Sequence, residues 1–558
     1  MVRIPVLLSR LSDKLALDGE PGLSGVQRMG PSGACNSLDL FGLASEDLQP
    51  VPKSQRQWTS WNFVGFWIAD ACNIATWMIA SSMIVGGLSW WQAWLAVWVG
   101  YGVTAVFIVL TGRIGAVYHV SFPVMGRASF GIWGSLWPVL NRVVMACVWY
   151  GVNGYIGGHA VYIMIHAIWT SWDRDKIPNT FGSGTTTADF VSYFIFWFCS
   201  LPALWFPVYK IRHLFTLKAY IVPPAAIAYL IWVAVRAGGI GPVVARPGRL
   251  HGSALAWAFI KGVMSCVANF STVIINDSDF TRFARKPRDA LWSQLLGLPL
   301  AFAATSLVGI LVSSASEVIY GEPVWDPLRL LERLVQGASA GERFGVFLIA
   351  FAFSLAQLGT NIAANSVSAG TDMTALVPRY INIRRGSYIC AAVGLSICPW
   401  VLLKNSDTFL TYLSAYAIFF SAMAGIITTD YYIVRRGYLN VPELYSARKS
   451  GPYYYTFGVH WRAYVAYIAG ILINIVGFAG QVGATVPIGA KYLFNLHFFG
   501  GFIVSSMVYW LLCTVSPIPE TRTQWSEVLE SDAESDLPTV TRSSSDDKGG
   551  ISVWEKGA

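Results

Sequence analysis

The sequence is dominated by long apolar segments that alternate with short polar ones. About 20 apolar residues span the hydrocarbon core of a bilayer, and most of these segments reach that length. Hydrophobic residues make up 54% of the 558 residues and charged residues only 13%, whereas a soluble chain carries roughly 25% charged residues. The pattern predicts an all-α polytopic membrane protein with about twelve transmembrane helices, at 61–85, 89–111, 133–158, 190–208, 216–236, 255–277, 292–315, 344–373, 387–403, 408–433, 461–481 and 490–514.

Two polar segments flank this apolar region. Residues 1–60 and 516–558 lack a hydrophobic pattern, and the second contains the acidic run ESDAESDLP. We therefore expect disordered tails on either side of a transmembrane domain at 61–515. Lys and Arg are more frequent in the loops that share a side with the tails, and this bias predicts that both termini are cytoplasmic.

The net charge, the cysteines and the short motifs narrow the function classes. The net charge of +8 comes from basic residues between apolar runs, which indicates membrane orientation and argues against a nucleic-acid partner. The eight cysteines are scattered, without the spacing of a metal site or a disulfide framework. The sequence contains no P-loop, no nucleophile–base motif and no HExxH, so it predicts no catalytic residues, no cofactor and no metal.

Polar residues interrupt the first and sixth apolar segments near their middles. The first contains Asp70 and Asn73, and the sixth contains Asn269, Ser271 and Thr272. Interruptions at corresponding positions of two halves predict an inverted repeat with broken helices around a site at the membrane midplane. Asp70 either has a functional role, in which it takes up a proton or orders the unwound turn, or is a structural carboxylate hydrogen-bonded to neighbouring helix ends. The sequence leaves both interpretations open.

The third segment carries an indole and a carboxamide on one helical face. Trp149 and Asn153 are four residues apart, a spacing at which helical side chains are neighbours. An indole can stack on a flat heterocycle while an amide reads its donors and acceptors; an interfacial Trp and a packing Asn would give the same spacing. Phe270 in the sixth segment could supply a second stacking face or belong to the core.

The eighth segment has an unusual density of amides and hydroxyls for a membrane span. Thr360, Asn361 and Asn365 indicate a lined cavity, although polar residues between closely packed helices are the alternative. Two charged positions admit a gating role. Lys261, near the outer end of the sixth segment, either extends to the headgroups or lies at an entrance. Asp279 belongs either to an inner gate or to a solvated helix end.

Several stretches together resemble one known family. They are DLQPVPKSQRQWTSWNFVGFWIAD, NIATWMIASSM, SFPVMGRASFGIWGSLWPVLNRVVM, NDSDFTRFARKP, LGTNIAANSVSAGTDM and TTDYYIVRRGYLNVPELY, between about residues 47 and 515. The set resembles the fungal uracil, allantoin and uridine permeases of the nucleobase–cation symporter-1 family. The resemblance implies the five-plus-five inverted-repeat fold of the leucine transporter, with two additional helices.

The resemblance also assigns expected roles to residues. It implies that Trp149 stacks the substrate, that Asn153 stands where many uracil-type members have Gln, and that Phe270, Asn365 and Asn361 complete the site. Sodium-coupled bacterial relatives bind their cation at a Ser-Thr pair that is Gly359-Thr360 here. Because one hydroxyl is missing and Asp70 is nearby, we expect proton coupling rather than sodium coupling.

The leading hypothesis is therefore a plasma-membrane importer that moves uracil, allantoin or a related oxidised purine together with protons. The resemblance also implies ubiquitin and the endocytic machinery as partners of the tails, with Lys548 and Lys556 as acceptors. The alternatives are a transporter of uridine, thiamine or another heterocycle, a nutrient receptor that does not transport, and an integral-membrane enzyme. Substrate, stoichiometry and oligomeric state are not fixed by the sequence.

Overall fold

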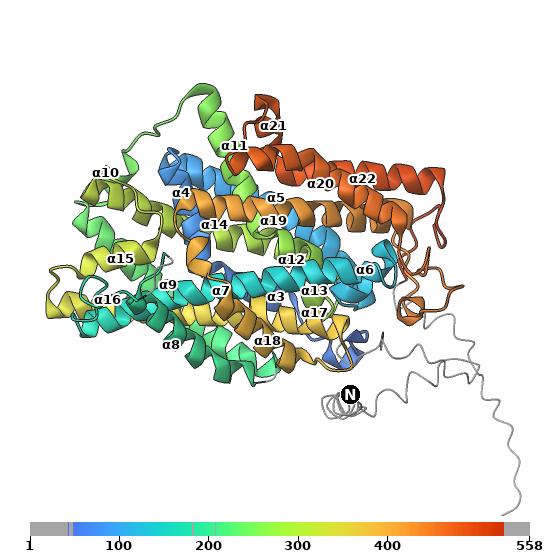
Figure 1. Cartoon of the computed structure of the whole chain (residues 1–558), viewed down its shortest axis with the longest axis horizontal. Coiled ribbons are helices and arrows are strands. Elements are labelled where there is room, and N and C mark those ends of the chain that lie inside the picture. The colour runs from blue at the N-terminus through green and yellow to red at the C-terminus, as the bar shows by residue number, and fades with distance from the viewer. Residues whose placement is uncertain (1–42, 44–47, 181–183, 207, 529–558) are drawn as a thin grey trace, which may run out of the picture.

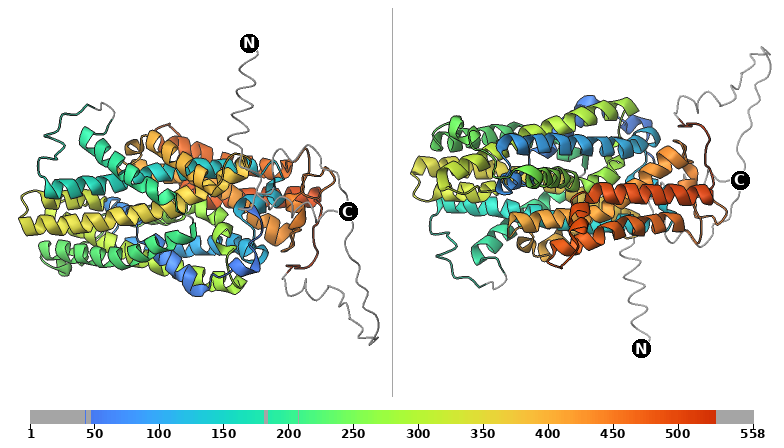
Figure 2. Two further views of the ribbon diagram at one scale, coloured as in Figure 1. Left: turned by 90° about the horizontal axis from the view of Figure 1, so that it is seen from below. Right: turned by 90° about the horizontal axis from the view of Figure 1, so that it is seen from above.

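A computed structural model describes residues 43, 48–180, 184–206 and 208–528. The long helices run side by side along the longest axis of the molecule, with the short α10 (Ile240–Val244) and α15 (Pro327–Val335) at one end and α6 (Phe122–Phe130) at the other (Figure 1). Views from two opposite sides show the same parallel arrangement (Figure 2). The bundle is that of a polytopic membrane protein, as predicted.

Each of the twelve predicted segments corresponds to a helix or a broken helix in the described part of the chain. They are α3 and α4 (Ser60–Ala71 and Ile74–Val85), α5 (Trp90–Tyr118), α7 (Leu136–Ile168), α8 (Thr187–Leu204), α9 (Val208–Arg236), α11 and α12 (Gly252–Asn269 and Ser271–Asn276), α14 (Pro287–Tyr320), α16, η5 and α17 (Ala340–Thr360, Asn361–Val367 and Ser368–Leu376), α18 (Ile383–Ser396), α19 and η7 (Ser406–Thr429 and Asp430–Val434), α20 (Trp461–Gln481) and α22 (His497–Val515). By length and composition alone, eight helices in the described residues could cross a membrane, or nine with the bent pair α3–α4.

Short elements connect these helices. They are η4 (Lys53–Gln55), α13 (Ser278–Thr281), η6 (Pro399–Val401), η8 (Pro442–Tyr445) and α21 (Ile488–Phe494), together with α6, α10 and α15. The amphipathic α15 buries Leu328, Leu331 and Leu334, so it packs on the end of the bundle opposite α6 (Figure 1) and does not cross the bundle.

The first predicted interruption is a real break. Helices α3 and α4 meet at an angle of 60°, and Asn73 lies between them as the N-cap of α4. Its side-chain oxygen accepts from the backbone N–H of Thr76 at 2.8 Å, and its Nδ2 donates to the backbone oxygen of Asp70 at 2.5 Å. Asn is a favoured N-cap because its side chain satisfies a free helix-end N–H, so Asn73 stabilises the bend.

A second break divides the sixth span, as predicted. Helix α11 ends at Asn269 and α12 begins at Ser271, with Phe270 outside helical geometry at φ −102° and ψ 7°. The eighth span departs from α-helical geometry in another way, because η5 is a π-helical turn from Asn361 to Val367. Such turns inside α-helices are often found at functional sites.

The inner parts of the two predicted tails pack against the helices. Leu48 and Val51 are buried, and Glu527 forms an ion pair with Arg113 of α5 at 2.6 Å. The Trp525 ring stacks on Tyr432. The remainder of the tails, residues 1–42, 44–47 and 529–558, lies outside the described residues.

Candidate functional site

The predicted polar residues of the third and eighth spans meet across one helix interface. Asn361 Nδ2 donates to the backbone oxygen of Tyr150 at 3.0 Å, and Asn365 Nδ2 donates to Asn361 Oδ1 at 3.0 Å. Asn153 Oδ1 accepts from Gln357 Nε2 at 3.3 Å. The π-helical turn and α16 thus present a row of carboxamides to the face of α7 that carries Trp149.

The Trp149 indole contacts aromatic rings of α19. Its centroid lies 5.9 Å from that of Tyr412 and 6.5 Å from that of Tyr416. The Tyr416 hydroxyl also donates to the backbone oxygen of Asn269, beside the break in the sixth span, at 3.4 Å. Helix α19 therefore connects the indole to the broken helix.

Phe270 occupies a different environment from the one its proposed role suggests. Its ring makes edge contacts with Trp67, Tyr101 and Phe302, at centroid distances of 5.8, 5.9 and 4.9 Å. These partners belong to α3, α5 and α14. The ring packs among the bundle helices, and the ring contacts of Phe270 within the described part of the chain do not include Trp149.

Two cavities lie at different levels along α7. The inner one, of about 40 Å³, is lined by Trp149, Asn365, Asp70 and Phe280 among others. The outer one, of about 460 Å³, reaches Tyr155 and Ile156 of α7. Asn153 falls between these levels, so its bond with Gln357 lies between the outer and the inner cavity.

A buried charge cluster lies at the end of the inner cavity that is farther from the outer cavity. Arg142 Nε donates to Asp372 Oδ2 at 2.6 Å, and its Nη2 lies 3.9 Å from Asp279 Oδ2. Asp279 also accepts from the backbone N–H of Phe122 at 2.8 Å. Asp279, predicted to belong either to an inner gate or to a solvated helix end, is buried and joins α13 to α6 and α7.

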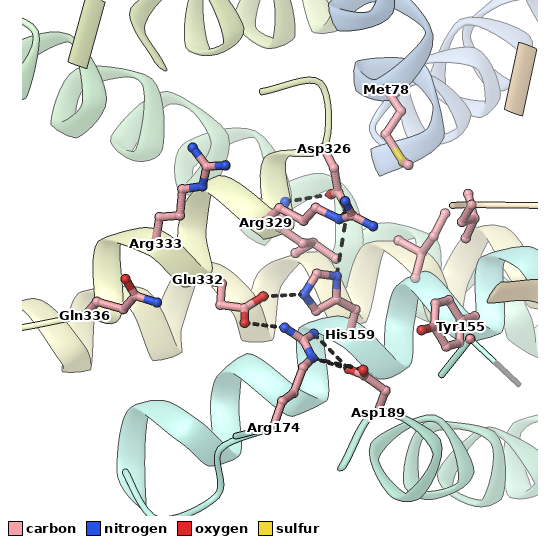
Figure 3. Close-up of a pocket in the computed structure, with 14 residues that line it drawn as sticks. Met78, Tyr155, His159, Arg174, Asp189, Asp326, Arg329, Glu332, Arg333 and Gln336 are labelled. Atoms are coloured by element: carbon pink, nitrogen blue, oxygen red, sulfur yellow. Dashed lines mark hydrogen bonds and ion pairs between the residues drawn. The ribbon is translucent and has the colours of Figure 1, made fainter. Parts of the chain in front are cut away.

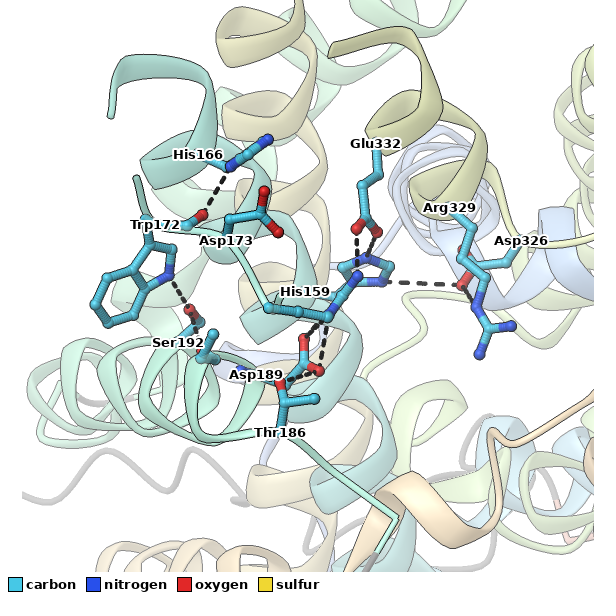
Figure 4. A network of polar contacts seen from close by, with 12 residues as sticks. His159, His166, Trp172, Asp173, Thr186, Asp189, Ser192, Asp326, Arg329 and Glu332 are labelled. Carbon is cyan, nitrogen blue, oxygen red and sulfur yellow. Dashed lines mark hydrogen bonds and ion pairs between the residues drawn. The ribbon is translucent and has the colours of Figure 1, made fainter. Parts of the chain in front are cut away.

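A second charge cluster borders the outer cavity (Figure 3). His159 Nε2 of α7 lies 3.1 Å from Glu332 of α15 (Figure 4). Arg174 contacts both Glu332 and Asp189 of α8 (Figure 3). Asp326 Oδ2 lies 3.9 Å from His159 Nδ1. The cluster ties α15 to the outer ends of α7 and α8.

The charge cluster beside the outer cavity favours the ionised form of the Glu332 carboxyl. Burial alone would raise the pKa of Glu332, but the hydrogen bond and charge of His159 and the charge of Arg174 outweigh it. Together they lower the pKa of Glu332 from 4.5 to about 2.

The expected cation position contains a lysine side chain. Lys218 of α9 is fully buried, and its Nζ donates to Thr360 Oγ1 at 2.6 Å. A Cβ added at Gly359 would lie 3.1 Å from Lys218 Cδ, so the glycine provides the room for this side chain. The ammonium also interacts electrostatically with the Asp70 carboxylate.

Sequence reasoning missed several members of this site. Gln357 precedes Asn361 by four residues, and that spacing alone could have identified it. No comparable signal pointed to Lys218, because its role comes from a contact with a helix 142 residues away. Lys261, in contrast, is exposed on α11 and lines neither cavity. The described residues include no group of His, Cys, Asp and Glu side chains that could hold a metal ion.

Comparison with known proteins decides the family. The model of the permease family for cytosine/purines, uracil, thiamine and allantoin matches residues 50–501. The chain belongs to this family of permeases. Its members are transporters, which fits the absence of enzyme motifs in the sequence.

Curated relatives of this permease are similar over most of their length. The uracil permease of Saccharomyces cerevisiae is 49% identical over 86% of this chain and 77% of its own. The allantoin permease of the same yeast is 48% identical over 87% of this chain and 78% of its own. The resemblance inferred from the sequence motifs is thereby confirmed.

A solved structure confirms the fold of the permease. The inward-facing conformation of Mhp1 matches with a TM-score of 0.67 at 21% identity, over 86% of this chain and 96% of that one. A second structure, of Mhp1 from the nucleobase-cation-symport-1 family in a closed conformation with bromovinylhydantoin bound, has a TM-score of 0.66 at the same identity, over 86% of this chain and 98% of that one. The predicted five-plus-five inverted-repeat fold is thus confirmed.

Proposed function

We propose that this permease imports uracil, allantoin or a related nucleobase or oxidised purine across the plasma membrane together with protons. The observation that carries the proposal is that Trp149 and Asn365 line the inner cavity, while Asn153, bonded to Gln357, lies between the inner and the outer cavity. A central site between two cavities is what alternating access requires.

The chemistry of this site suits a small, flat, neutral heterocycle. The Trp149 indole offers an apolar face for stacking, and each carboxamide offers both a donor and an acceptor. Uracil and allantoin carry adjacent carbonyl and N–H groups, which such amides can pair. The names of the uracil and allantoin permeases at 49% and 48% identity support the same substrate class. Phe270 would approach the substrate only in another state of the transport cycle, since it now packs against Phe302.

Proton coupling is supported by the position of Lys218. Its ammonium contacts Thr360 at 2.6 Å, next to a glycine that supplies no side-chain oxygen. A sodium ion at this place would meet a positive charge within a few ångströms, where Coulomb repulsion in a buried site is strong. Lys218 and the Asp70 carboxylate interact electrostatically, and an ammonium and a carboxylate can each bind or release a proton without binding a metal cation.

The membrane orientation and the modification of the tails are proposed from the bias of Lys and Arg in the loops and from the family resemblance. We propose that both termini face the cytoplasm, with Arg113, Arg142 and Asp279 at the inner end of the bundle. The tails would receive ubiquitin for endocytosis at Lys548 and Lys556, which lie outside the described residues.

The test is uptake of radiolabelled uracil and allantoin by cells that lack their own permeases for these compounds. Accumulation against a gradient, abolished by a protonophore, is the expected result. Binding without accumulation would instead identify a receptor, and a chemically altered product inside the cell would identify an enzyme. Either of these outcomes would overturn the proposal.

A further inference from the structure

Three carboxamides form a row along one face of the eighth span. Gln357, Asn361 and Asn365 follow one another at intervals of four residues, which places them on the same side of a helix. Asn365 donates to Asn361, and Asn361 donates to the backbone of Tyr150. Gln357 is the outermost member, and its partner is the side chain of Asn153 on α7.

The hydrogen bond between Gln357 and Asn153 involves the amide nitrogen of Gln357 and the amide oxygen of Asn153, and leaves the other polar atom of each amide out. Gln357 Nε2 donates to Asn153 Oδ1 at 3.3 Å. The Gln357 side chain is completely buried, yet its Oε1 has no hydrogen-bond partner among the described residues. The hydrogen bonds of the described residues likewise give Asn153 Nδ2 no acceptor. A buried amide with an unpaired acceptor is costly unless a ligand pairs with it.

We propose that Gln357 is a positioning residue that determines which face of the Asn153 amide the substrate meets. By donating to Asn153 Oδ1, Gln357 leaves the Nδ2 of Asn153 as a donor and its own Oε1 as an acceptor. One donor and one acceptor match the lactam edge of uracil or allantoin, in which a carbonyl is adjacent to an N–H. The inference rests on the proposed function and specifies how the same site selects its substrate.

The lengths of the two side chains support this division of roles. Asn153 is one methylene shorter than a Gln at the same place, so it reaches less far from α7. Gln357 extends toward it from the facing helix and fixes its orientation. A rotation of the Asn153 amide about its last bond would exchange donor for acceptor, and the hydrogen bond from Gln357 opposes that exchange.

The first experiment reverses the hydrogen bond. In Gln357→Glu a carboxylate can only accept, so Asn153 should turn its Nδ2 toward position 357 and present its Oδ1 to the substrate. Cytosine has an exocyclic amine where uracil has a carbonyl, so the affinity for cytosine should rise relative to the affinity for uracil. We expect the ratio of the cytosine and uracil inhibition constants to fall by about 3- to 10-fold, the effect of one net hydrogen bond. Inhibition is measured against uptake of labelled uracil or allantoin, whichever the wild type accumulates.

The second experiment separates positioning from structure. Gln357→Met keeps the length of the side chain but neither donates nor accepts as an amide does. In the wild-type background we expect it to weaken uracil inhibition by about 3- to 10-fold and to reduce discrimination against cytosine. In an Asn153→Ala background the same substitution should leave the ratio of the cytosine and uracil inhibition constants unchanged, because Gln357 acts through Asn153. Ser354→Ala, on the same helix, is the matched control and should leave both constants unchanged.

The outcomes are distinguishable. An unchanged inhibition ratio in both Gln357 variants, with uptake intact, would overturn the inference and leave the proposed function standing. An equal effect of Gln357→Met with and without Asn153 would also overturn it, as would failure of both variants to reach the membrane while Ser354→Ala does. If the wild type accumulates neither labelled compound, the proposed function itself fails.

Discussion

Lys218 Nζ lies 2.6 Å from Thr360 Oγ1 and is completely enclosed by protein. The side chain passes over Gly359, where an added Cβ would come within 3.1 Å of Lys218 Cδ. The absence of a side chain at position 359 therefore provides the space that Lys218 of α9 occupies. This arrangement places the Lys218 ammonium at the position where the family resemblance implies the cation of sodium-coupled relatives.

Uptake should consequently be independent of external sodium. Replacing sodium with choline at constant pH should change the initial rate by less than about 2-fold, whereas a protonophore should abolish accumulation. Lys218→Met should lower concentrative uptake by roughly 10-fold or more, because hydrogen bonds to charged groups contribute more than neutral ones. A loss of transport in choline would mean that a sodium site persists beside Lys218.

Asp70→Asn should separate exchange from accumulation. The permanently neutral amide cannot take up or release a proton, so concentrative uptake should be lost and the increase of uptake at low external pH should become weaker. Exchange of labelled for unlabelled substrate across the membrane needs no net proton movement and should survive. Measurement of both modes in the same vesicles tests the assignment; retention of the full pH dependence in this variant would contradict it.

Trp149→Ala should remove the stacking surface. Loss of an aromatic platform costs roughly 1–3 kcal/mol of binding, so uptake at low substrate concentration should fall about 5- to 100-fold. Trp149→Phe, which keeps a smaller ring, should lie between the wild type and the alanine variant. A fluorescent fusion controls for arrival at the plasma membrane. Unchanged uptake by the alanine variant would place the substrate elsewhere.

Glu332→Gln should destabilise the outer end of the bundle. The substitution removes the charge that pairs with Arg174 and the hydrogen-bond partner of His159, which should cost roughly 1–3 kcal/mol. The pKa of Glu332 is lowered from 4.5 to about 2 in the folded protein. The ionised carboxylate therefore contributes its full stabilisation above about pH 4.5, and this contribution decreases as the pH falls from about 4.5 toward 2.

The measurement for this variant is the temperature at which the detergent-solubilised protein loses its monodisperse elution profile. The wild type should lose stability between pH 5 and pH 3 more steeply than Glu332→Gln, so the two curves should converge at low pH, as the linkage requires. Arg333→Gln, whose partner Glu322 is 64% exposed, is a suitable control with an expected change of less than about 1 kcal/mol. Parallel curves for the wild type and Glu332→Gln would show that the carboxyl does not titrate with folding.

Several features of this protein were determined by local sequence. A run of about 20 apolar residues can satisfy its backbone in a bilayer only as a helix, so the spans could be predicted from composition. The bend after Asp70 is encoded by Asn73, a good N-cap in the middle of a span. The common face of Trp149 and Asn153 follows from their spacing of four residues on one helix. The family could be identified because its motifs are contiguous stretches of the chain.

Contacts between helices were decided only by the tertiary structure. Spacing along one helix says nothing about which neighbour the shared face meets, and that choice depends on how all the spans pack together. Packing brings Gln357 to Asn153, 204 residues away, and Lys218 to Thr360, 142 residues away. It also surrounds Phe270 with Trp67, Tyr101 and Phe302. The sequence thus determined the helices and the types of side chain in the site. The partners of each side chain were decided by packing, because a buried polar or aromatic group pairs with the residues that the neighbouring helix places at the same depth.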